Sequence, residues 1–243
     1  MNVLEVQGLT KRYPAFTLNG VSFDVPQGAV MGFIGRNGAG KSTTLKSILG
    51  MVHPDAGAVR VFGMDYVENE RAIRRELGVV LGGIDFYPKK KIKTITDVTR
   101  RFYNNWDEEK YRHYLELFHI DESKRVDQLS SGMKVKYMIA LALSHNARLL
   151  ILDEPTSGLD PVSRDELTEL LRRVVADGTR SVLFSTHITS DLEKCATHIA
   201  FIKDGELQYT GSLDDFRTHY KDVGATLEDI IVHVERRPLD EDA

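Results

Sequence analysis

Short apolar or alternating segments, separated by turn residues, dominate the first third of the chain. Such segments, bounded by proline, glycine and asparagine, are typical of β-strands joined by tight turns. The predicted strands are Val3–Leu9, Val21–Val25 and Ala29–Ile34. The predicted turns between them lie at Pro14, Asn19-Gly20 and Pro26-Gln27-Gly28. We therefore expect a β-region of several short strands at the start of the chain.

Helical periodicity begins directly after a glycine-rich turn and returns in the middle of the chain. A helix over Lys41–Leu49 would bury one apolar face and end at Gly50. A strand is predicted at Ala58–Phe62, and Asp107 is a candidate N-cap for a later helix. The apolar side chains that recur one turn apart behind this cap are Tyr111, Tyr114, Leu115 and Phe118. The middle section is therefore expected to be a helical insert.

A second group of alternating helices and strands follows. A helix is predicted at Met133–His145, and the wholly apolar run Leu149–Leu152 suits a strand that is buried on both faces. Ser163 and Glu166 have the spacing of a capping box at the start of the next helix, which Asp177-Gly178 would end. The remaining predicted strands are Ser181–Ser185, His198–Lys203 and Glu206–Tyr209, with a turn at Asp204-Gly205 between the last two.

Composition narrows the classes of function that the chain can have. The 243 residues are 42% apolar, which is enough for a core, and the formal net charge of −4 gives no electrostatic basis for binding nucleic acid. Cys195 is the only cysteine, so no intramolecular disulfide can form. The N-terminus does not have the pattern of a secretory signal, and the apolar runs are far shorter than the ~20 residues that span a bilayer. We expect an intracellular protein that reaches a membrane only through a partner.

A phosphate-binding motif lies between a predicted strand and a predicted helix. It reads Gly35, Arg36, Asn37, Gly38, Ala39, Gly40, Lys41, Ser42 and Thr43, and fits the P-loop spacing G-x-x-x-x-G-K-[ST]. Glycines let backbone N–H groups approach phosphate oxygens, and a helix N-terminus favours negative charge. We expect Lys41 to reach the β- and γ-phosphates of a bound nucleotide, Ser42 to ligate Mg²⁺ and Thr43 to bind a phosphate. The alternative is an ordinary glycine-rich turn.

Two carboxylates follow the apolar run that begins at Leu149. Asp153 would hold Mg²⁺ through water, and Glu154 would polarise the water that attacks the γ-phosphate. The alternative is a strand that ends in two solvated acids. The P-loop elsewhere in the chain favours the catalytic interpretation.

Further motifs follow in order. Leu129-Ser130-Ser131-Gly132-Met133 precedes a helix, Ser157-Gly158-Leu159-Asp160 follows the two carboxylates, Ser185-Thr186-His187 ends a strand, and Tyr13 lies near the N-terminus. With these motifs the sequence resembles the ABC ATPase family over about residues 1–235. The resemblance implies that Ser130, Ser131 and Gly132 form the signature that faces the nucleotide of a partner cassette. It also implies that Asp160 belongs to the D-loop at the dimer interface, that His187 acts at the γ-phosphate and that Tyr13 stacks on adenine.

The resemblance also implies an architecture. The fold class is α/β, a P-loop NTPase core of the ABC ATPase type with an N-terminal antiparallel β-region and a helical subdomain insert. The whole chain, 1–243, would be one ABC ATPase domain. Residues 1–86 and 148–215 would form the RecA-like core with its β-region, 87–147 the helical subdomain, and 216–243 a C-terminal helix with an acidic tail.

The sequence departs from the family pattern at two motifs. Gly82, with Gly83 after it, stands where the family has the Q-loop glutamine that senses Mg²⁺ or the attacking water and relays the nucleotide state to the membrane subunit; Asp85 is a weak substitute. Ser131 and Met133 replace a glycine and a glutamine of the signature, a version that resembles cassettes of ABC-2-type and bacitracin-resistance-type exporters. The lysines at 89–91 and 93 are interpreted as a solvated charge run, with contact to a membrane subunit or lipid phosphates as the alternative.

The expected function is that of an ATP-hydrolysing ABC transporter subunit. It would use ATP and Mg²⁺, dimerise with a second cassette, as a homo- or heterodimer, and drive a separately encoded transmembrane permease, which is expected to be an exporter. Its place would be cytoplasmic, peripheral on the inner face of the cell membrane, with no nucleic-acid partner. Two alternatives stay open: a soluble ABC ATPase of DNA repair or translation, and a weakly hydrolysing regulatory cassette in a heterodimer.

Overall fold

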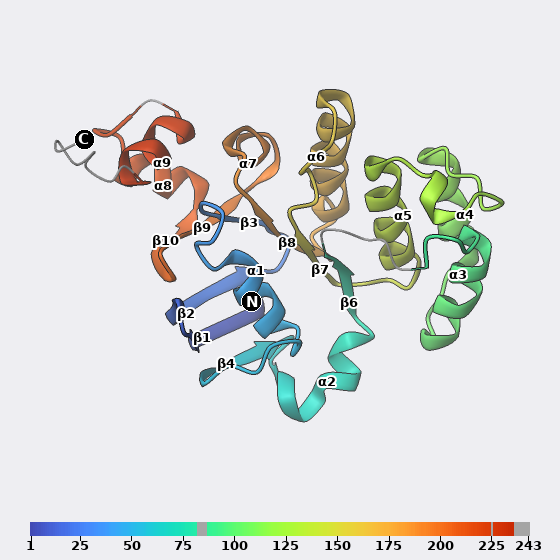
Figure 1. The fold of residues 1–243 in the computed structure, drawn as a ribbon, viewed down its shortest axis with the longest axis horizontal. Helices are drawn as coiled ribbons and strands as arrows, with labels where there is room; N and C mark the ends of the chain where they lie inside the picture. The colour runs from blue at the N-terminus through green and yellow to red at the C-terminus, as the bar shows by residue number, and fades with distance from the viewer. Residues whose placement is uncertain (82–86, 225, 236–243) are drawn as a thin grey trace.

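The computed structural model describes residues 1–81, 87–224 and 226–235 and arranges their strands in two sheets (Figure 1). The smaller sheet is antiparallel, with strand order β2-β1-β4-β5. Its strands are β1 (Asn2–Tyr13), β2 (Phe16–Pro26), β4 (Ala56–Val61) and β5 (Met64–Asp65). The β-region expected from the opening pattern is therefore confirmed.

The larger sheet has strand order β10-β9-β3-β8-β7-β6 and is parallel except for β10. Its strands are β3 (Val30–Ile34), β6 (Leu77–Val80), β7 (Leu149–Asp153), β8 (Ser181–Thr186), β9 (His198–Lys203) and β10 (Glu206–Ser212). Every residue of β3, β7 and β8 is buried, because both faces of the sheet are covered. The continuous apolar runs in the sequence reflect this burial.

Helices and the smaller sheet cover the two faces of the larger sheet. The helices are α1 (Lys41–Ile48), α2 (Tyr66–Arg74), α3 (Ile92–Thr99), α4 (Glu108–Leu117), α5 (Ser131–Ser144), α6 (Pro161–Val175), α7 (Thr189–Cys195), α8 (Leu213–His219) and α9 (Leu227–Glu235). Met31 and Phe33 of β3 join one apolar core with α1 and the smaller sheet. Val30 and Ile34 point the other way, into a second core shared with α5, α6 and α7. The alternation along β3 thus separates two cores.

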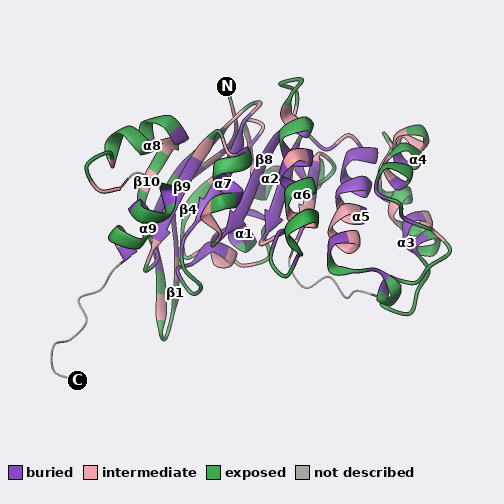
Figure 2. Cartoon of the chain, turned by 90° about the horizontal axis from the view of Figure 1, so that it is seen from above, coloured by how far each residue is buried: buried purple, intermediate pink, exposed green. Residues whose placement is uncertain are grey.

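The helices α3, α4 and α5 stand together at one end of the molecule (Figure 1). The outer surfaces of α3 and α4 are exposed, whereas β3, β7 and β8 of the larger sheet are buried (Figure 2). The hydroxyl of Thr96 lies 2.7 Å from that of Tyr111 and 2.8 Å from that of Tyr137, so one buried hydrogen-bonded group joins three helices. Asp107 caps α4 by accepting a hydrogen bond from Lys110 N, as the sequence predicted.

Two sequence predictions about local structure are wrong. Asn19-Gly20 does not end a strand: it forms a β-bulge inside β2, where two residues oppose Thr10 alone and Gly20 takes a φ of +62°. The capping box of Ser163 and Glu166 does not form either, because α6 begins earlier, at Pro161. Asp160 caps the helix by accepting hydrogen bonds from the N–H groups of its first turn. Within the described residues, no helix combines the length and hydropathy needed to cross a membrane.

Candidate functional site

The predicted P-loop connects the end of β3 to the start of α1. Gly40 stands at the N-cap of α1 with a φ of +113°, a conformation that glycine adopts without strain. Among the described residues, no side chain caps this helix N-terminus. Its N–H groups are therefore available to an anion, and Ser42 and Thr43 lie in the same first turn.

Neighbouring strands explain why two P-loop positions are glycine. A Cβ at Gly35 would overlap the carbonyl oxygen of Ile202 in β9, and one at Gly40 would lie 2.9 Å from the Phe16 ring. Phe16 pairs with Tyr13 across the hairpin of β1 and β2, so the proposed adenine-stacking residue lies directly opposite a residue that packs on the loop. Tyr13 itself is 42% exposed. Sequence reasoning missed Phe16, because this contact joins distant segments.

Lys41 is buried beneath the P-loop. Only 5% of its side chain is exposed, and its Nζ donates hydrogen bonds to the carbonyl oxygens of Gly35 (2.7 Å) and Arg36 (3.2 Å). The same Nζ lies 3.2 Å from Glu154 Oε1. The structure thus brings the predicted phosphate-binding lysine and the predicted catalytic carboxylate together.

The C-terminal ends of β7 and β8 supply the other polar groups of the site. Glu154 adopts a φ of +49°, uncommon for a residue with a side chain, and its Oε2 accepts a hydrogen bond of 2.8 Å from His187 Nδ1. Ser185 Oγ donates to Asp153 Oδ1 at 2.6 Å and accepts from Glu154 N at 2.9 Å. Ser185 therefore fixes both acids. Its role escaped sequence reasoning, which saw only a serine at the end of a strand.

The signature and D-loop residues begin two neighbouring helices. Ser130 is the N-cap of α5, where its Oγ accepts a hydrogen bond from Met133 N at 3.2 Å, and Ser131 and Gly132 form the first helical turn. A Cβ on Gly132 would touch Ser163 of α6 at 3.4 Å, so the two helix starts pack closely. Asp160 caps α6 and is exposed; the Ser163 hydroxyl and the backbone N–H groups at the helix start lower the pKa of its carboxyl group. Gly82 and Asp85, which concern the Q-loop prediction, lie outside the described residues.

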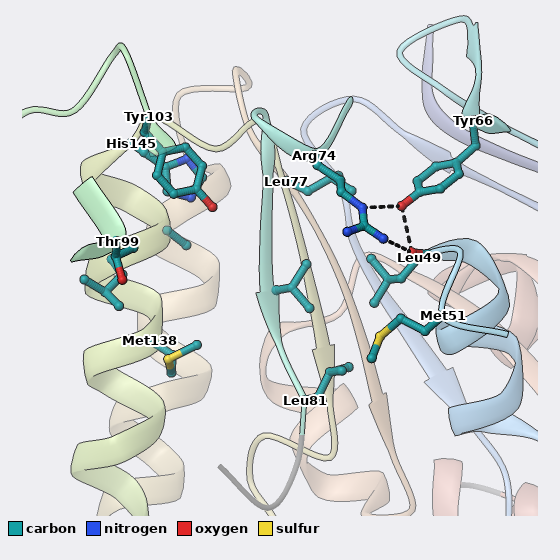
Figure 3. Close-up of a pocket in the computed structure, with 13 residues that line it drawn as sticks. Leu49, Met51, Tyr66, Arg74, Leu77, Leu81, Thr99, Tyr103, Met138 and His145 are labelled. Atoms are coloured by element: carbon teal, nitrogen blue, oxygen red, sulfur yellow. Dashed lines mark hydrogen bonds between the residues drawn. The ribbon is translucent and has the colours of Figure 1, made fainter. Parts of the chain in front are cut away.

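A largely apolar pocket of about 420 Å³ lies between β6, the C-terminal half of α5 and the end of α1 (Figure 3). On one side, Tyr66 donates a hydrogen bond to the carbonyl oxygen of Leu49 at 2.7 Å, and Arg74 donates to both. On the other side, the rings of Tyr103 and His145 stack with centroids 3.7 Å apart. Leu81, the last described residue before the Q-loop position, lines the same pocket.

Comparison with known proteins identifies relatives of the chain. A family model described as ABC transporter matches residues 18–157. The bacitracin transport ATP-binding protein BcrA of Bacillus licheniformis is 32% identical over 208 residues, covering 84% of this chain and 68% of that protein. The Nod factor export ATP-binding protein I of Burkholderia thailandensis is 34% identical over 208 residues, covering 83% of this chain and 68% of that protein.

Solved structures give the same result for the fold. The structure of an ATP-binding subunit of an ABC transporter superposes with a TM-score of 0.84 at 30% identity, covering 95% of this chain and 98% of that chain. Its agreement over nearly the whole chain confirms the predicted α/β fold class. The chain therefore belongs to the ABC transporter family, as one of its ATP-binding, ATP-hydrolysing cassettes.

Proposed function

We propose that the chain hydrolyses ATP at the P-loop to drive a separately encoded membrane permease that exports its substrate. The observation that carries the catalytic part is the position of Glu154, whose carboxylate is held between Lys41 at 3.2 Å and His187 at 2.8 Å. A carboxylate beside the phosphate-binding loop is placed to orient a water molecule and accept its proton.

The reaction needs positioning and electrostatic stabilisation more than covalent chemistry. The N–H groups of residues 35–43 would hold the phosphates, and Lys41 would turn from Glu154 to the γ-phosphate. Glu154 would then take a proton from water as the water oxygen bonds to the γ-phosphorus and the bond to the bridging oxygen breaks. His187 would donate a hydrogen bond to the phosphoryl group that is being transferred.

The donor set fits Mg²⁺. Asp153 and Ser42 offer carboxylate and hydroxyl oxygens, the ligand type that this cation prefers, and Asp153 is held in a fixed orientation by Ser185. Bound there, Mg²⁺ would neutralise charge on the phosphates. The role of the chain's own residues is to hold these oxygens beside the P-loop.

A second cassette would complete each nucleotide site. Ser130, Ser131 and Gly132 lie at the N-terminus of α5, where backbone N–H groups favour an anion. We propose that they face the γ-phosphate held by the P-loop of the partner cassette, with Asp160 at the interface. This arrangement would be the same whether the partner is a second copy of the chain or a related chain.

The permease would contact the pocket shown in Figure 3. Two of its lining residues, Val79 and Leu81, belong to or directly follow β6, the strand that leads to the Q-loop position. A segment bound there would therefore touch the strand that leads to the Q-loop position, which the family resemblance assigns to coupling. The relatives named for bacitracin transport and Nod factor export support an exporter, and docking to a permease would place the chain on the inner face of the cell membrane.

Glu154→Gln tests the catalytic assignment. The variant should bind ATP and form a dimer, because the amide keeps the shape of the site, but its turnover should fall by about a hundredfold or more because the base is lost. Calorimetry, size-exclusion chromatography with ATP and phosphate release measure the three properties. The control, Glu169→Gln, loses only exposed ion pairs within α6 and should hydrolyse ATP normally. Normal hydrolysis by Glu154→Gln would remove Glu154 from this role.

The same assay separates the alternatives. A regulatory cassette would bind ATP with little turnover until a second, different cassette is added. A cassette of DNA repair or translation would be stimulated by nucleic acid rather than by a permease in vesicles; the net charge of −4 gives no support for this.

A further inference from the structure

Three polar side chains meet behind the catalytic loop with incomplete hydrogen bonding: those of Thr156 and Asp191 are buried, and that of Arg164 is 29% exposed but has a buried Nε. Thr156 and Asp191 are fully buried, at 0% exposure. Among the described residues, none donates to or accepts from Thr156 Oγ1, Arg164 Nε or either carboxylate oxygen of Asp191. Arg164 Nε is 3.9 Å from Asp191 Oδ1, too long for a hydrogen bond. Buried polar groups in this state are rare in native proteins and call for an explanation.

Each of the three residues follows a segment that takes part in the proposed reaction. Thr156 comes two positions after Glu154, and Asp191 comes four positions after His187, in the first turn of α7. Arg164 comes four positions after Asp160, in the first turns of α6. The helices α6 and α7 lie side by side on the same face of the larger sheet (Figure 2). The cluster therefore lies where three functional segments converge.

The charges in the cluster are complementary but incompletely paired. Burial raises the pKa of Asp191, and the Thr156 hydroxyl and the Arg164 guanidinium act against that rise. A small displacement of the start of α6 towards α7 would bring Arg164 within hydrogen-bond distance of the carboxylate. An unpaired buried carboxylate is unfavourable. A contact that pushes Asp160, and with it the start of α6, towards α7 would therefore be favoured by the closing of this pair.

We propose that Asp191 is a positioning residue for ATP hydrolysis, linking the start of α6 through Arg164 and the loop after Glu154 through Thr156. When a partner cassette presses on Asp160, the Arg164–Asp191 pair closes and holds Glu154 and His187 in their working positions. This inference rests on the proposed function and adds to it the residue that transmits dimer closure to the catalytic groups.

An exposed ion pair between the same two helices provides a matched control. Lys194 of α7 lies 2.6 Å from Asp165 of α6, and the two side chains are 47% and 66% exposed. Solvent screens this pair, so its loss should have little effect. Asp191 and Asp165 thus differ in burial and in their link to the catalytic loop, not in the helices that they join.

The test compares Asp191→Asn, Asp191→Glu and Asp165→Asn in ATP hydrolysis. Asp191→Asn should lower kcat by about tenfold while the KM for ATP changes by less than about twofold, since the P-loop is intact. Asp191→Glu, which restores the charge, should recover part of kcat, and Asp165→Asn should match the wild type. In a double-mutant cycle, the kcat of the Asp191→Asn,Arg164→Gln double variant should be no lower than that of Asp191→Asn alone. ATP-driven dimerisation in the Glu154→Gln background should also weaken with Asp191→Asn.

Several outcomes would overturn the inference. These are a wild-type kcat in Asp191→Asn, no recovery in Asp191→Glu, or additive effects in the Arg164→Gln cycle. Should Asp191→Asn fail to fold, Arg164→Gln and Thr156→Val must each show the same loss of kcat at unchanged KM. If the wild-type chain does not hydrolyse ATP, the proposed function fails, and the dimerisation readout still decides the role of Asp191.

Discussion

At the scale of single residues, Lys41 makes contacts that ATP must replace. Its ammonium group donates hydrogen bonds to two P-loop carbonyl oxygens and lies against Glu154. These contacts hold the positive charge where the phosphates of ATP would bind. Lys41→Ala should weaken ATP binding about 10- to 100-fold, the range expected for a lost hydrogen bond to a charged group. Calorimetric titration measures it, with the exposed Lys46→Ala of α1 as the control. Unchanged affinity would mean that the phosphates do not reach this lysine.

His145 makes a second prediction at this scale, about pH and stability. Burial lowers the pKa of its imidazole to about 4 from the model-compound value of 6.5, and its Nδ1 has no hydrogen-bond partner among the described residues. The unfolded chain therefore binds more protons than the folded chain between these values, so stability falls as the pH falls through that window, by about 3 kcal/mol in total. His145→Phe keeps a ring against Tyr103 and should flatten this dependence. Urea unfolding at pH 7.5 and 5 measures the free energy of unfolding of both proteins. An equal change in this free energy between the two pH values in both proteins would refute the assignment.

At the scale of elements, the turn between β9 and β10 connects the P-loop to β2. Gly205 donates its N–H to Ala39 O of the P-loop at 3.0 Å, and its own carbonyl accepts from Asn19 N of β2 at 2.9 Å. Its φ is +85°, and a Cβ there would overlap the carbonyl oxygen of Thr17. This turn therefore supports the P-loop from behind.

Gly205→Ala should consequently lower both stability and ATP affinity. The control is Gly63→Ala, at a φ of +77° with no atom within 4 Å of the added Cβ, which should cost about 1–2 kcal/mol through backbone strain alone. Gly205→Ala should cost more and also weaken ATP binding at a temperature where the variant is folded. Denaturant unfolding and calorimetry separate the two effects; intact ATP affinity would show that the P-loop does not depend on this turn.

Local patterns in the sequence predicted elements whose causes are themselves local. The P-loop lies between a strand and a helix, the turn Asp204-Gly205 lies between β9 and β10, and Asp107 caps α4, all as expected. The cap of α6 was misassigned because two candidates compete there, and Asp160 with Pro161 forms the better start. Ser185 and Phe16 could not be assigned, because their roles depend on partners more than twenty positions away in the sequence.

At the scale of the whole molecule, the hydrophobic pattern of the sequence does not predict the order of the strands in the sheet. The sequence indicates a buried strand at Leu149–Leu152, but only the fold places β8 between β3 and β7 and so brings His187 to Glu154. The family resemblance implied only that His187 acts at the γ-phosphate, where Glu154 is also expected to act, and the structure shows the contact between them.

The proposed dimer predicts that two inactive variants can restore activity to each other, because each nucleotide site takes residues from both chains. Each site would combine the P-loop of one cassette with the signature of the other, so Lys41→Ala and Ser130→Ala should each inactivate both sites of a symmetric dimer. In a mixed dimer, however, the intact P-loop of the Ser130→Ala chain faces the intact signature of the Lys41→Ala chain. An equal mixture of the two inactive variants should therefore regain up to about a quarter of wild-type hydrolysis, since about half of the dimers are mixed and each holds one complete site.

Phosphate release before and after mixing measures this recovery. The control is the Lys41→Ala,Ser130→Ala double variant added to wild type, whose mixed dimers hold no complete site and cannot gain activity. Absence of recovery, in a mixture shown by cross-linking to form mixed dimers, would require that both sites be intact for turnover or that the signature does not face the partner's nucleotide; hydrolysis by a covalently linked mixed dimer distinguishes these two explanations.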